Sequence, residues 1–279
     1  MCSSRSMNRN LSNNIPAKSR SPLAFFVLVF VLSIPFWVAG AVTSLRLLPG
    51  LPVSALMFVC PGTAALILVY RKNHLGGVIE LLKRGGDFRR IKAKIWFAPV
   101  ILLMPTIMIL SYLWMRWTGA PAPAPHFSMA ATIIMMFAFF LSALGEELGW
   151  SGYATDLMQG RRSALETAVL LGLVWAVWHF VPLLQVHRSP EWIAWWTLGT
   201  VAARILIVWI YNNTGRSVFA ATVFHATINL SWQLFPVNGS LYDPRITGLM
   251  VAIVATSVVF VWGPGMLTRS GGGSPRTRK

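Results

Sequence analysis

Five polar side chains, spread over three strongly apolar stretches, are of types that could do chemistry together. Glu146 and Glu147 close one stretch, His179 lies in the next, and His225 and Asn229 stand four residues apart in a later one. A carboxylate can take a proton from water, while imidazole and amide groups can donate hydrogen bonds to an oxyanion. These residue types are the parts needed to activate a water molecule against a carbonyl group.

The adjacent glutamates favour a general base. Neighbouring helical residues point about 100° apart, so one carboxylate can face a cavity while the other orients a neighbour. Two carboxylates this close resist being ionised together in a dry site, which suits a group that must accept a proton. The alternative is an acidic pair hydrated at the membrane surface.

The histidines have structural alternatives too. Trp175 and His179 share a helix face, as do His225 and Asn229, because each pair is four residues apart. A buried histidine can simply bond to a neighbouring helix, and an asparagine can link two helices. Ionisable groups inside membrane spans are costly and usually functional, so the combination favours a site. Arg204, the remaining charge within a span, either pairs with a carboxylate or snorkels, and receives no catalytic role.

The elements that must position these residues are membrane-spanning helices. The chain has 279 residues, of which 55% are hydrophobic and 11% charged, against about 25% charged in soluble domains. A span needs about 20 apolar residues. The sequence therefore predicts an all-α, polytopic transmembrane helical bundle of about eight spans. The segments are roughly 23–43, 51–70, 95–117, 128–150, 166–184, 192–211, 217–235 and 246–267.

The formal net charge of +16 is distributed unevenly between the loops. One set of alternate loops and tails holds 19 basic residues and the other set only 4. Cytoplasmic loops carry the excess of Lys and Arg, so we expect a multi-pass protein of the cell membrane with both termini cytoplasmic. Because the basic residues follow this pattern, the lipid bilayer is the expected partner and nucleic acid is not.

The chain is expected to form one domain, with no internal repeat. Residues 1–22 form a cytoplasmic polar tail, 23–267 the transmembrane domain, and 268–279 a disordered basic tail. Alternating prolines in 119–125 predict an extended outer loop. The small residues at 39–41 resemble a signal-peptide cleavage site, but the apolar run is longer than a signal peptide requires, which favours a retained span.

The order Glu-Glu, Trp-xxx-His, His-xxx-Asn resembles the CPBP family of intramembrane proteases. That family includes the eukaryotic CAAX prenyl endopeptidase and the bacterial Abi and bacteriocin-processing proteins. Its pattern is EExxxR, FxxxH and HxxxN or HxxxB on successive membrane helices, and the matching core here is about residues 140–232. Two positions depart from it: Ser151 stands in place of the arginine, and Trp175 in place of the phenylalanine.

The resemblance implies an intramembrane endopeptidase, a metalloendopeptidase-like hydrolase acting on a membrane-bound protein or peptide, with or without a prenyl group. Carried over, Glu146 would be the general base, aided by His179. Glu147 would orient it or share its proton, and His225 with Asn229 would hold the oxyanion.

Metal dependence stays open in this resemblance. His179, His225 and a glutamate could form a three-ligand zinc site with an open position. The sequence lacks HExxH, the usual helical zinc signature. A metal-free glutamate mechanism is the alternative.

Two other functions remain as alternatives. Loss of the motif arginine at Ser151 favours a catalytically weakened relative acting as a membrane binding or immunity protein. Glu146 and His179 could instead form the proton relay of a small proton-coupled transporter, although no inverted repeat is visible.

The predicted spans place the site residues at different depths in the membrane. Glu146 falls near the cytoplasmic end of its span and His225 about nine residues in, roughly 13 Å deep. His179 falls nearer the outer end.

Overall fold

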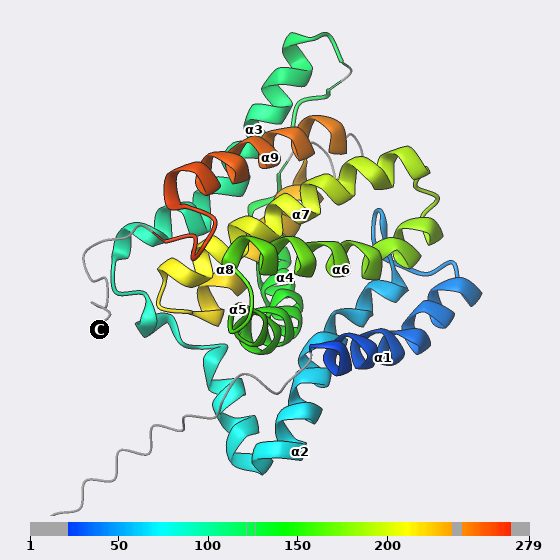
Figure 1. Ribbon diagram of the computed structural model, residues 1–279. Helices are drawn as coiled ribbons and strands as arrows, with labels where there is room; N and C mark the ends of the chain where they lie inside the picture. The colour runs from blue at the N-terminus through cyan, green and yellow to red at the C-terminus, as the bar shows by residue number, and fades with distance from the viewer. Residues whose placement is uncertain (1–21, 121, 126, 236–241, 269–279) are drawn as a thin grey trace, which may run out of the picture.

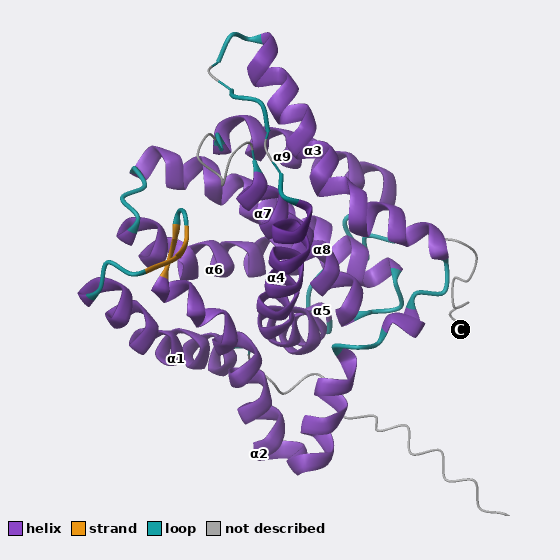
Figure 2. Ribbon diagram, turned by 180° about the vertical axis from the view of Figure 1, so that it is seen from behind, coloured by secondary structure: helices purple, strands orange, loops and turns teal. Residues whose placement is uncertain are grey.

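The chain folds into a bundle of helices with a very short hairpin at one end (Figures 1 and 2). The computed structural model describes residues 22–120, 122–125, 127–235 and 242–268. The helices are α1 (Leu23–Val42), α2 (Val59–Arg84), α3 (Phe97–Trp117), α4 (Met129–Gly149), α5 (Asp156–Gln159), α6 (Ala164–Gln185), α7 (Pro190–Asn213), α8 (Val218–Leu234) and α9 (Pro244–Trp262). Strands β1 (Arg46–Leu48) and β2 (Leu51–Pro52) pair antiparallel. Short 3-10 turns cover Val53–Phe58, Phe88–Arg90 and Lys94–Trp96.

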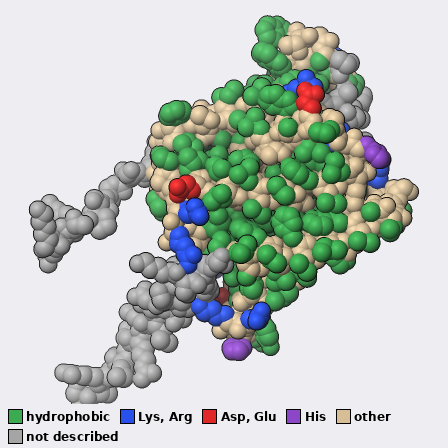
Figure 3. Space-filling model, turned by 45° about the vertical axis from the view of Figure 1, so that its right-hand side comes forward, with side chains coloured by type: hydrophobic (Ala, Val, Ile, Leu, Met, Phe, Trp, Pro, Cys, Tyr) green, Lys and Arg blue, Asp and Glu red, His purple; other side chains and the backbone are tan. Residues whose placement is uncertain are grey.

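The helices confirm the predicted fold class, a polytopic helical membrane bundle. Seven helical segments of the described chain are long and apolar enough to cross a membrane. The remaining predicted span, 217–235, corresponds to α8, which has 17 residues and is at the short end of the usual range of about 17–25. Hydrophobic side chains cover most of the face in Figure 3, and the few charged ones on it are scattered. That surface suits a lipid environment.

One predicted boundary is wrong in α2, because the helix continues beyond the apolar residues. The stretch 71–84 was expected to begin a cytoplasmic loop, but it is helical up to Arg84 and interrupted at His74, where φ is 50° and ψ is −155°. Lys, Arg, Leu and Glu are good helix formers, so a charged sequence is no obstacle to a helix outside the membrane. Figure 1 shows α2 changing direction at its lower end.

A second boundary is wrong at the end of α4. The span was expected to end near residue 150. Instead, a π-helical turn at Trp150–Thr155 follows α4 directly and leads into α5. The continuous helical segment Met129–Gln159 is 31 residues long. Glu146 and Glu147 consequently lie inside the helical segment rather than at its end.

Glycines let α2 and α4 approach closely where the glutamates lie. A Cβ atom built on Gly149 would be 2.4 Å from the backbone carbonyl of Pro61, and one on Gly62 would be 2.6 Å from the carbonyl oxygen of Gly145. No larger side chain fits at such distances, and small residues commonly permit close helix contacts in membranes. The crossing fixes the height and rotation of the segment that bears Glu146 and Glu147.

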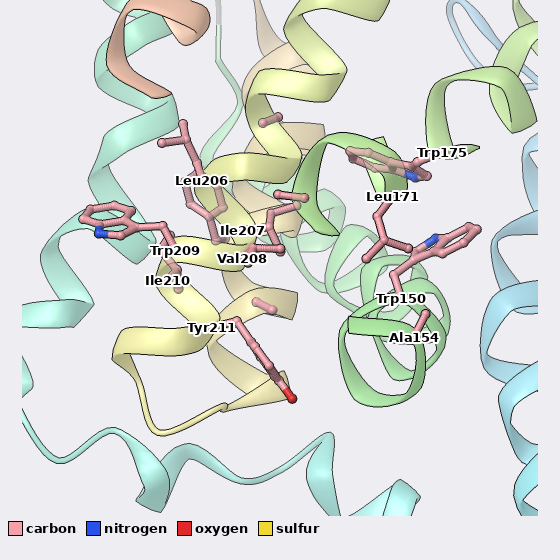
Figure 4. Packing of buried hydrophobic residues seen from close by; sticks show 14 of the residues in the cluster. Trp150, Ala154, Leu171, Trp175, Leu206, Ile207, Val208, Trp209, Ile210 and Tyr211 are labelled. Carbon is pink, nitrogen blue, oxygen red and sulfur yellow. The ribbon is translucent and has the colours of Figure 1, made fainter. Parts of the chain in front are cut away.

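The core lies between α6, α7 and the π-helical turn. Figure 4 shows Trp150 and Leu171 from one side and Leu206 and Ile207 from the other, all fully buried. The first helix joins this core, because the Ser33 hydroxyl accepts a 2.7 Å hydrogen bond from the indole of Trp178. Residues 119, 120 and 122–125 are non-helical, as predicted for the proline-rich loop. The two predicted tails lie outside the described residues, apart from positions 22 and 268.

Candidate active site

The two glutamates are buried at the centre of the bundle. Glu146 is 5% exposed and Glu147 is 0% exposed. The sequence placed Glu146 near the cytoplasmic end of its span and far from the histidines, and this was wrong. The helical segment extends ten residues past Gly149, to Gln159, so the carboxylates lie at the depth of the imidazoles. The geometric problem posed by the sequence therefore disappears.

Glu147 is fixed by three side chains from separate parts of the chain. Nη1 of Arg204 on α7 donates to both carboxylate oxygens at 3.0 Å. Nδ1 of His225 on α8 lies 3.0 Å from Oε1, and the Ser151 hydroxyl donates to Oε2. The side chains of Arg204 and Glu147 are both fully buried. Charge-assisted bonds of this kind are strong, so the Glu147 carboxylate is held in one position and has no oxygen left free.

Glu146 has a different environment. Its Oε2 accepts a 2.7 Å hydrogen bond from Nε1 of Trp175, and its Oε1 has no hydrogen bond to any described residue. The guanidinium carbon of Arg204 lies 4.2 Å from the centre of the Trp175 ring. Trp175 thus connects the two carboxylates while leaving one oxygen of Glu146 available.

His179 is held by its own helix and by aromatic rings. Its Nδ1 lies 2.8 Å from the carbonyl oxygen of Trp175. A carbonyl only accepts, so Nδ1 bears the hydrogen and Nε2 has the lone pair in the neutral ring. The centres of the Trp178 and Trp196 rings lie 4.7 and 5.5 Å from that of His179. The imidazole is therefore held in one orientation among apolar rings.

His225 and Asn229 lie one turn apart on α8, as their spacing predicted. The ring centre of His225 is 5.0 Å from that of Trp175, and its Nδ1 faces the Glu147 carboxylate. Because an ionised carboxylate only accepts, Nδ1 of His225 donates and Nε2 remains for other contacts. The amide of Asn229 has no hydrogen bond to any described residue. Both side chains retain groups that can meet a ligand.

These residues surround a cavity of about 500 Å³ whose walls are mainly apolar. We call its inner end the floor, formed by Glu146, Trp175, His179, His225 and Asn229, all of which line it. We call the end beside the β1–β2 hairpin and the α6–α7 loop the mouth. The mouth is lined by Gly50, Arg188, Trp192, Trp232 and Tyr242. The structure thus brings four of the five predicted site residues to the floor, with Glu147 directly behind them.

The three-ligand zinc site stays a prediction. Among the described residues, no three His, Cys, Asp or Glu side chains are grouped so as to hold a metal ion. Both oxygens of Glu147 already accept hydrogen bonds, so the glutamate of such a site would be Glu146, with Nε2 of His179 and Nε2 of His225.

Arg204 is the residue that sequence reasoning missed. Its position inside a span was noticed, but its partner could not be identified because Glu147 lies 57 positions away in the sequence. Ser151 was taken as a lost charge. In the structure, Ser151 contacts the same carboxylate that Arg204 binds. The signal was present in the sequence, since a lone intramembrane cation implies a buried anion.

Fold and site together define a class of protein. It is a helical, multi-pass membrane protein with a buried carboxylate–histidine centre at the floor of an apolar cavity. Such a centre has the residue types from which a hydrolase site can be built.

Comparison with known proteins gives a more particular similarity. Residues 127–231 match the family model "Type II CAAX prenyl endopeptidase Rce1-like". The chain is also 27% identical over 266 residues to "CAAX prenyl protease 2" of Methanococcus maripaludis, a match that covers 86% of this chain and 94% of that protein. The resemblance predicted from the motifs is confirmed, and the comparisons support a CAAX-type protease. The roles of the five site residues stay predictions.

Proposed function

We propose that the chain is an intramembrane endopeptidase in which Glu146 activates the water that cleaves a peptide bond. The observation that supports this most directly is the position of Glu146, on the floor of an apolar cavity that His179 and His225 also line. Apolar walls exclude bulk water, which strengthens each electrostatic interaction inside. A carboxylate with one unbonded oxygen in such a place suits proton abstraction.

The proposed reaction begins with a water molecule between Glu146 and the substrate carbonyl. Oε1 of Glu146 takes a proton from the water, and the oxygen attacks the carbonyl carbon. His179, through the lone pair on Nε2, accepts a hydrogen bond from the same water and helps to align it. When the tetrahedral intermediate collapses, the C–N bond breaks and the proton passes from Glu146 to the leaving amine. The products are one carboxylate and one amine.

His225 and Asn229 are proposed to hold the oxyanion. A protonated His225 donates from Nε2 to the substrate oxygen while its Nδ1–H donates to Glu147. The ionised Glu147, fixed by Arg204, stabilises that imidazolium and its orientation, much as a carboxylate does behind a catalytic histidine. The amide of Asn229 supplies a second donor. Removing one oxyanion donor typically costs about 100- to 1000-fold in rate.

The apolar walls are proposed to bind the hydrophobic part of a membrane-associated protein or peptide. The relative from Methanococcus maripaludis is called a CAAX prenyl protease, and a prenyl chain is one such hydrophobic group. From the uneven charge of the loops we expect both termini to be cytoplasmic. On that orientation, the β1–β2 hairpin and the mouth of the cavity face the opposite side of the membrane.

The weakened-relative alternative depended on the serine at position 151. Arg204 supplies a guanidinium to the same carboxylate from α7, so the reason for preferring a weakened protein is removed. No observation in the structure favours a transporter over the protease.

The deciding experiment is peptide cleavage by the purified full chain in nanodiscs, with prenylated and unprenylated peptides. Glu146→Gln keeps the shape of the side chain but removes the base, and we expect a loss of about 100- to 10,000-fold in kcat/KM. Glu80→Gln is the matched control, because Glu80 is exposed on α2, and it should cleave normally. A Glu146→Gln variant that folds and cleaves like the parent would contradict the proposal, as would a parent inactive on the whole panel.

A further inference from the structure

The chain between α2 and α3 lies at one surface of the membrane. Apolar helices able to span a bilayer precede and follow it, so both of its ends meet the same face, which is the one expected to be cytoplasmic. The helix of α2 is broken at His74, where φ is 50°. Residues 75–84 are helical again, and short turns then lead to α3 at Phe97. We call residues 75–95 the surface segment.

The helical part of the surface segment has an exposed apolar face. Leu75, Ile79 and Leu82 are 62%, 43% and 50% exposed, and their spacing of four and three residues puts them on one side of the helix. Leu81, on another side, is buried and lies 3.1 Å from the position of a Cβ built on Gly152. One side of the helix therefore contacts the protein and another presents leucine and isoleucine outward, as in helices that lie in a membrane interface.

The surface segment is also strongly basic. It contains six Lys and Arg residues and two acidic ones, Glu80 and Asp87. Asp87 pairs with Arg90 at 3.3 Å, and Glu80 forms no ion pair within the described chain. The exposed cations that have no acidic partner among the described residues are Lys83, Arg89, Lys92 and Lys94. The segment thus combines an outward apolar face with unpaired positive charge.

Hydrogen bonds to the bundle hold this charge in place. Oδ1 of Asp87 accepts from the Ser217 hydroxyl at 2.7 Å and from the backbone N–H of Phe219 at 3.1 Å, at the start of α8. Nη1 of Arg84 donates to the carbonyl oxygen of Gly152 at 2.6 Å. Between these anchors and α3 lies a hollow of about 520 Å³, lined by residues 86–90 and Lys92. The backbone that bears the cations is therefore fixed before any ligand arrives.

We infer that the surface segment docks on anionic phospholipid, with headgroup phosphates at Arg89 and Lys92 and the apolar face among acyl chains. Charge complementarity selects this occupant, because guanidinium and ammonium groups bind phosphate with charge-assisted hydrogen bonds and basic residues next to a span attract anionic lipid. A soluble anion would match the cations but leave Leu75, Ile79 and Leu82 uncovered. The inference does not depend on the proposed catalytic chemistry.

Lipid binding is tested by native mass spectrometry of the full chain in neutral detergent. Phosphatidylglycerol and phosphatidylcholine with the same acyl chains are offered in equal amounts, and we expect the parent to retain the anionic lipid at least about tenfold better. Arg89→Gln/Lys92→Gln should lower that retention about 10- to 30-fold and leave the neutral lipid unchanged. Arg161→Gln/Arg162→Gln is the matched control, because it removes the same charge from two exposed positions in another loop, and it should bind like the parent.

Several outcomes of that experiment would contradict the inference. Equal retention of the two lipids by the parent would do so, as would undiminished retention of the anionic lipid by Arg89→Gln/Lys92→Gln. An equal loss in the Arg161→Gln/Arg162→Gln control would show that binding follows net charge alone. Displacement of the lipid by inorganic phosphate would make the segment a site for a free anion, and displacement by polyglutamate a site for an acidic protein.

The seating of the apolar face is tested separately in nanodiscs that contain anionic lipid. Ile79→Cys and Glu80→Cys, each in a Cys2→Ser background, are labelled with a fluorescent dye; Cys60 is buried. Neighbouring helical residues point about 100° apart, so a nitroxide on the lipid acyl chain should quench the dye at position 79 at least about twofold more than at position 80. Equal quenching at the two positions, or stronger quenching at position 80, would show that the face does not rest on lipid.

Discussion

The floor and the mouth of the cavity are organised in opposite ways. Behind the floor, Glu147 has donors on both oxygens from Arg204, Ser151 and His225, without any ligand. At the mouth, Arg188 and Trp232 have no acceptor among the described residues. Preorganised groups cost nothing to arrange during the reaction, whereas unpaired donors gain most when a ligand arrives. The difference suggests that chemistry is built into the floor and recognition is completed by the substrate.

The largest effect should come from the charge behind the floor. Arg204→Ser leaves a buried Glu147 without its counter-ion, and breaking such a pair costs about 3–5 kcal/mol. We expect about a 100-fold or greater loss of kcat, together with a lower melting temperature. The double variant Ser151→Arg/Arg204→Ser supplies a guanidinium to Glu147 from the motif position instead. Its kcat should be at least about tenfold higher than that of Arg204→Ser.

Rescue of activity by a second variant distinguishes a role of Arg204 in positioning Glu147 from a general contribution to protein stability. Arg204→Lys, which keeps the charge but loses the planar fork, should fall between the parent and Arg204→Ser. The pH–rate profile of Ser151→Arg/Arg204→Ser should superimpose on that of the parent. If Arg204→Ser retains full activity, or if the folded double variant is as slow as the single one, Arg204 does not act through Glu147.

A smaller effect should follow from Trp175→Phe. This change removes the indole N–H that bonds to Glu146 and restores the phenylalanine of the motif while keeping an aromatic wall. We expect kcat to fall about 3- to 10-fold with KM little changed, which is the usual net value of one hydrogen bond. Steady-state cleavage measures both constants. A rise in KM alone would show that Trp175 binds substrate and does not position the base.

A still smaller effect should follow from Trp232→Phe at the mouth. The ring is kept, so the apolar wall survives and only the N–H donor is lost. We expect kcat/KM for cleaved peptides to fall about 2- to 5-fold. An unchanged kcat/KM would show that this N–H does not contact the substrate.

No effect is expected from metal removal. The proposed mechanism needs only carboxylate, imidazole and amide groups. Cleavage by protein dialysed against EDTA or incubated with phenanthroline should therefore match the untreated rate. Loss of activity that zinc restores would overturn the metal-free mechanism and return the zinc site to consideration.

Much of this arrangement could be predicted from the sequence. Apolar segments of about 20 residues predicted the bundle, because the bilayer demands helices of that length. The spacing of His225 and Asn229 predicted that they lie on one helix face, since residues i and i+4 share a face in any α-helix. The ion pair between Arg204 and Glu147 could not be derived, because it depends on how α4 and α7 cross and no local pattern records that.

The helix ends were predicted poorly for a related reason. Hydropathy marks where lipid contact ends, and helices do not have to end there. In α2 the charged stretch stays helical, and after Gly149 small and polar residues continue the helix in a wider form. The predicted depth of Glu146 in the membrane depended on ending the span near residue 150. Because that boundary was wrong, Glu146 seemed to be far from the histidines.

The π-helical turn at Trp150–Thr155 also has a consequence for how the chain tolerates length changes. Its wider winding holds one residue more than an α-helical turn, and the Thr155 hydroxyl bonds to the carbonyl of Trp150 across it. Removing one residue here would tighten the turn to an ordinary α-helix and leave α4 and α5 in nearly the same relative rotation, because the wide turn absorbs its extra residue. A one-residue deletion within the regular part of α4, after the two glutamates, would instead rotate them by about 100° against α5. The turn thus absorbs a change of length, and a deletion inside it should be tolerated better than one in the regular helix.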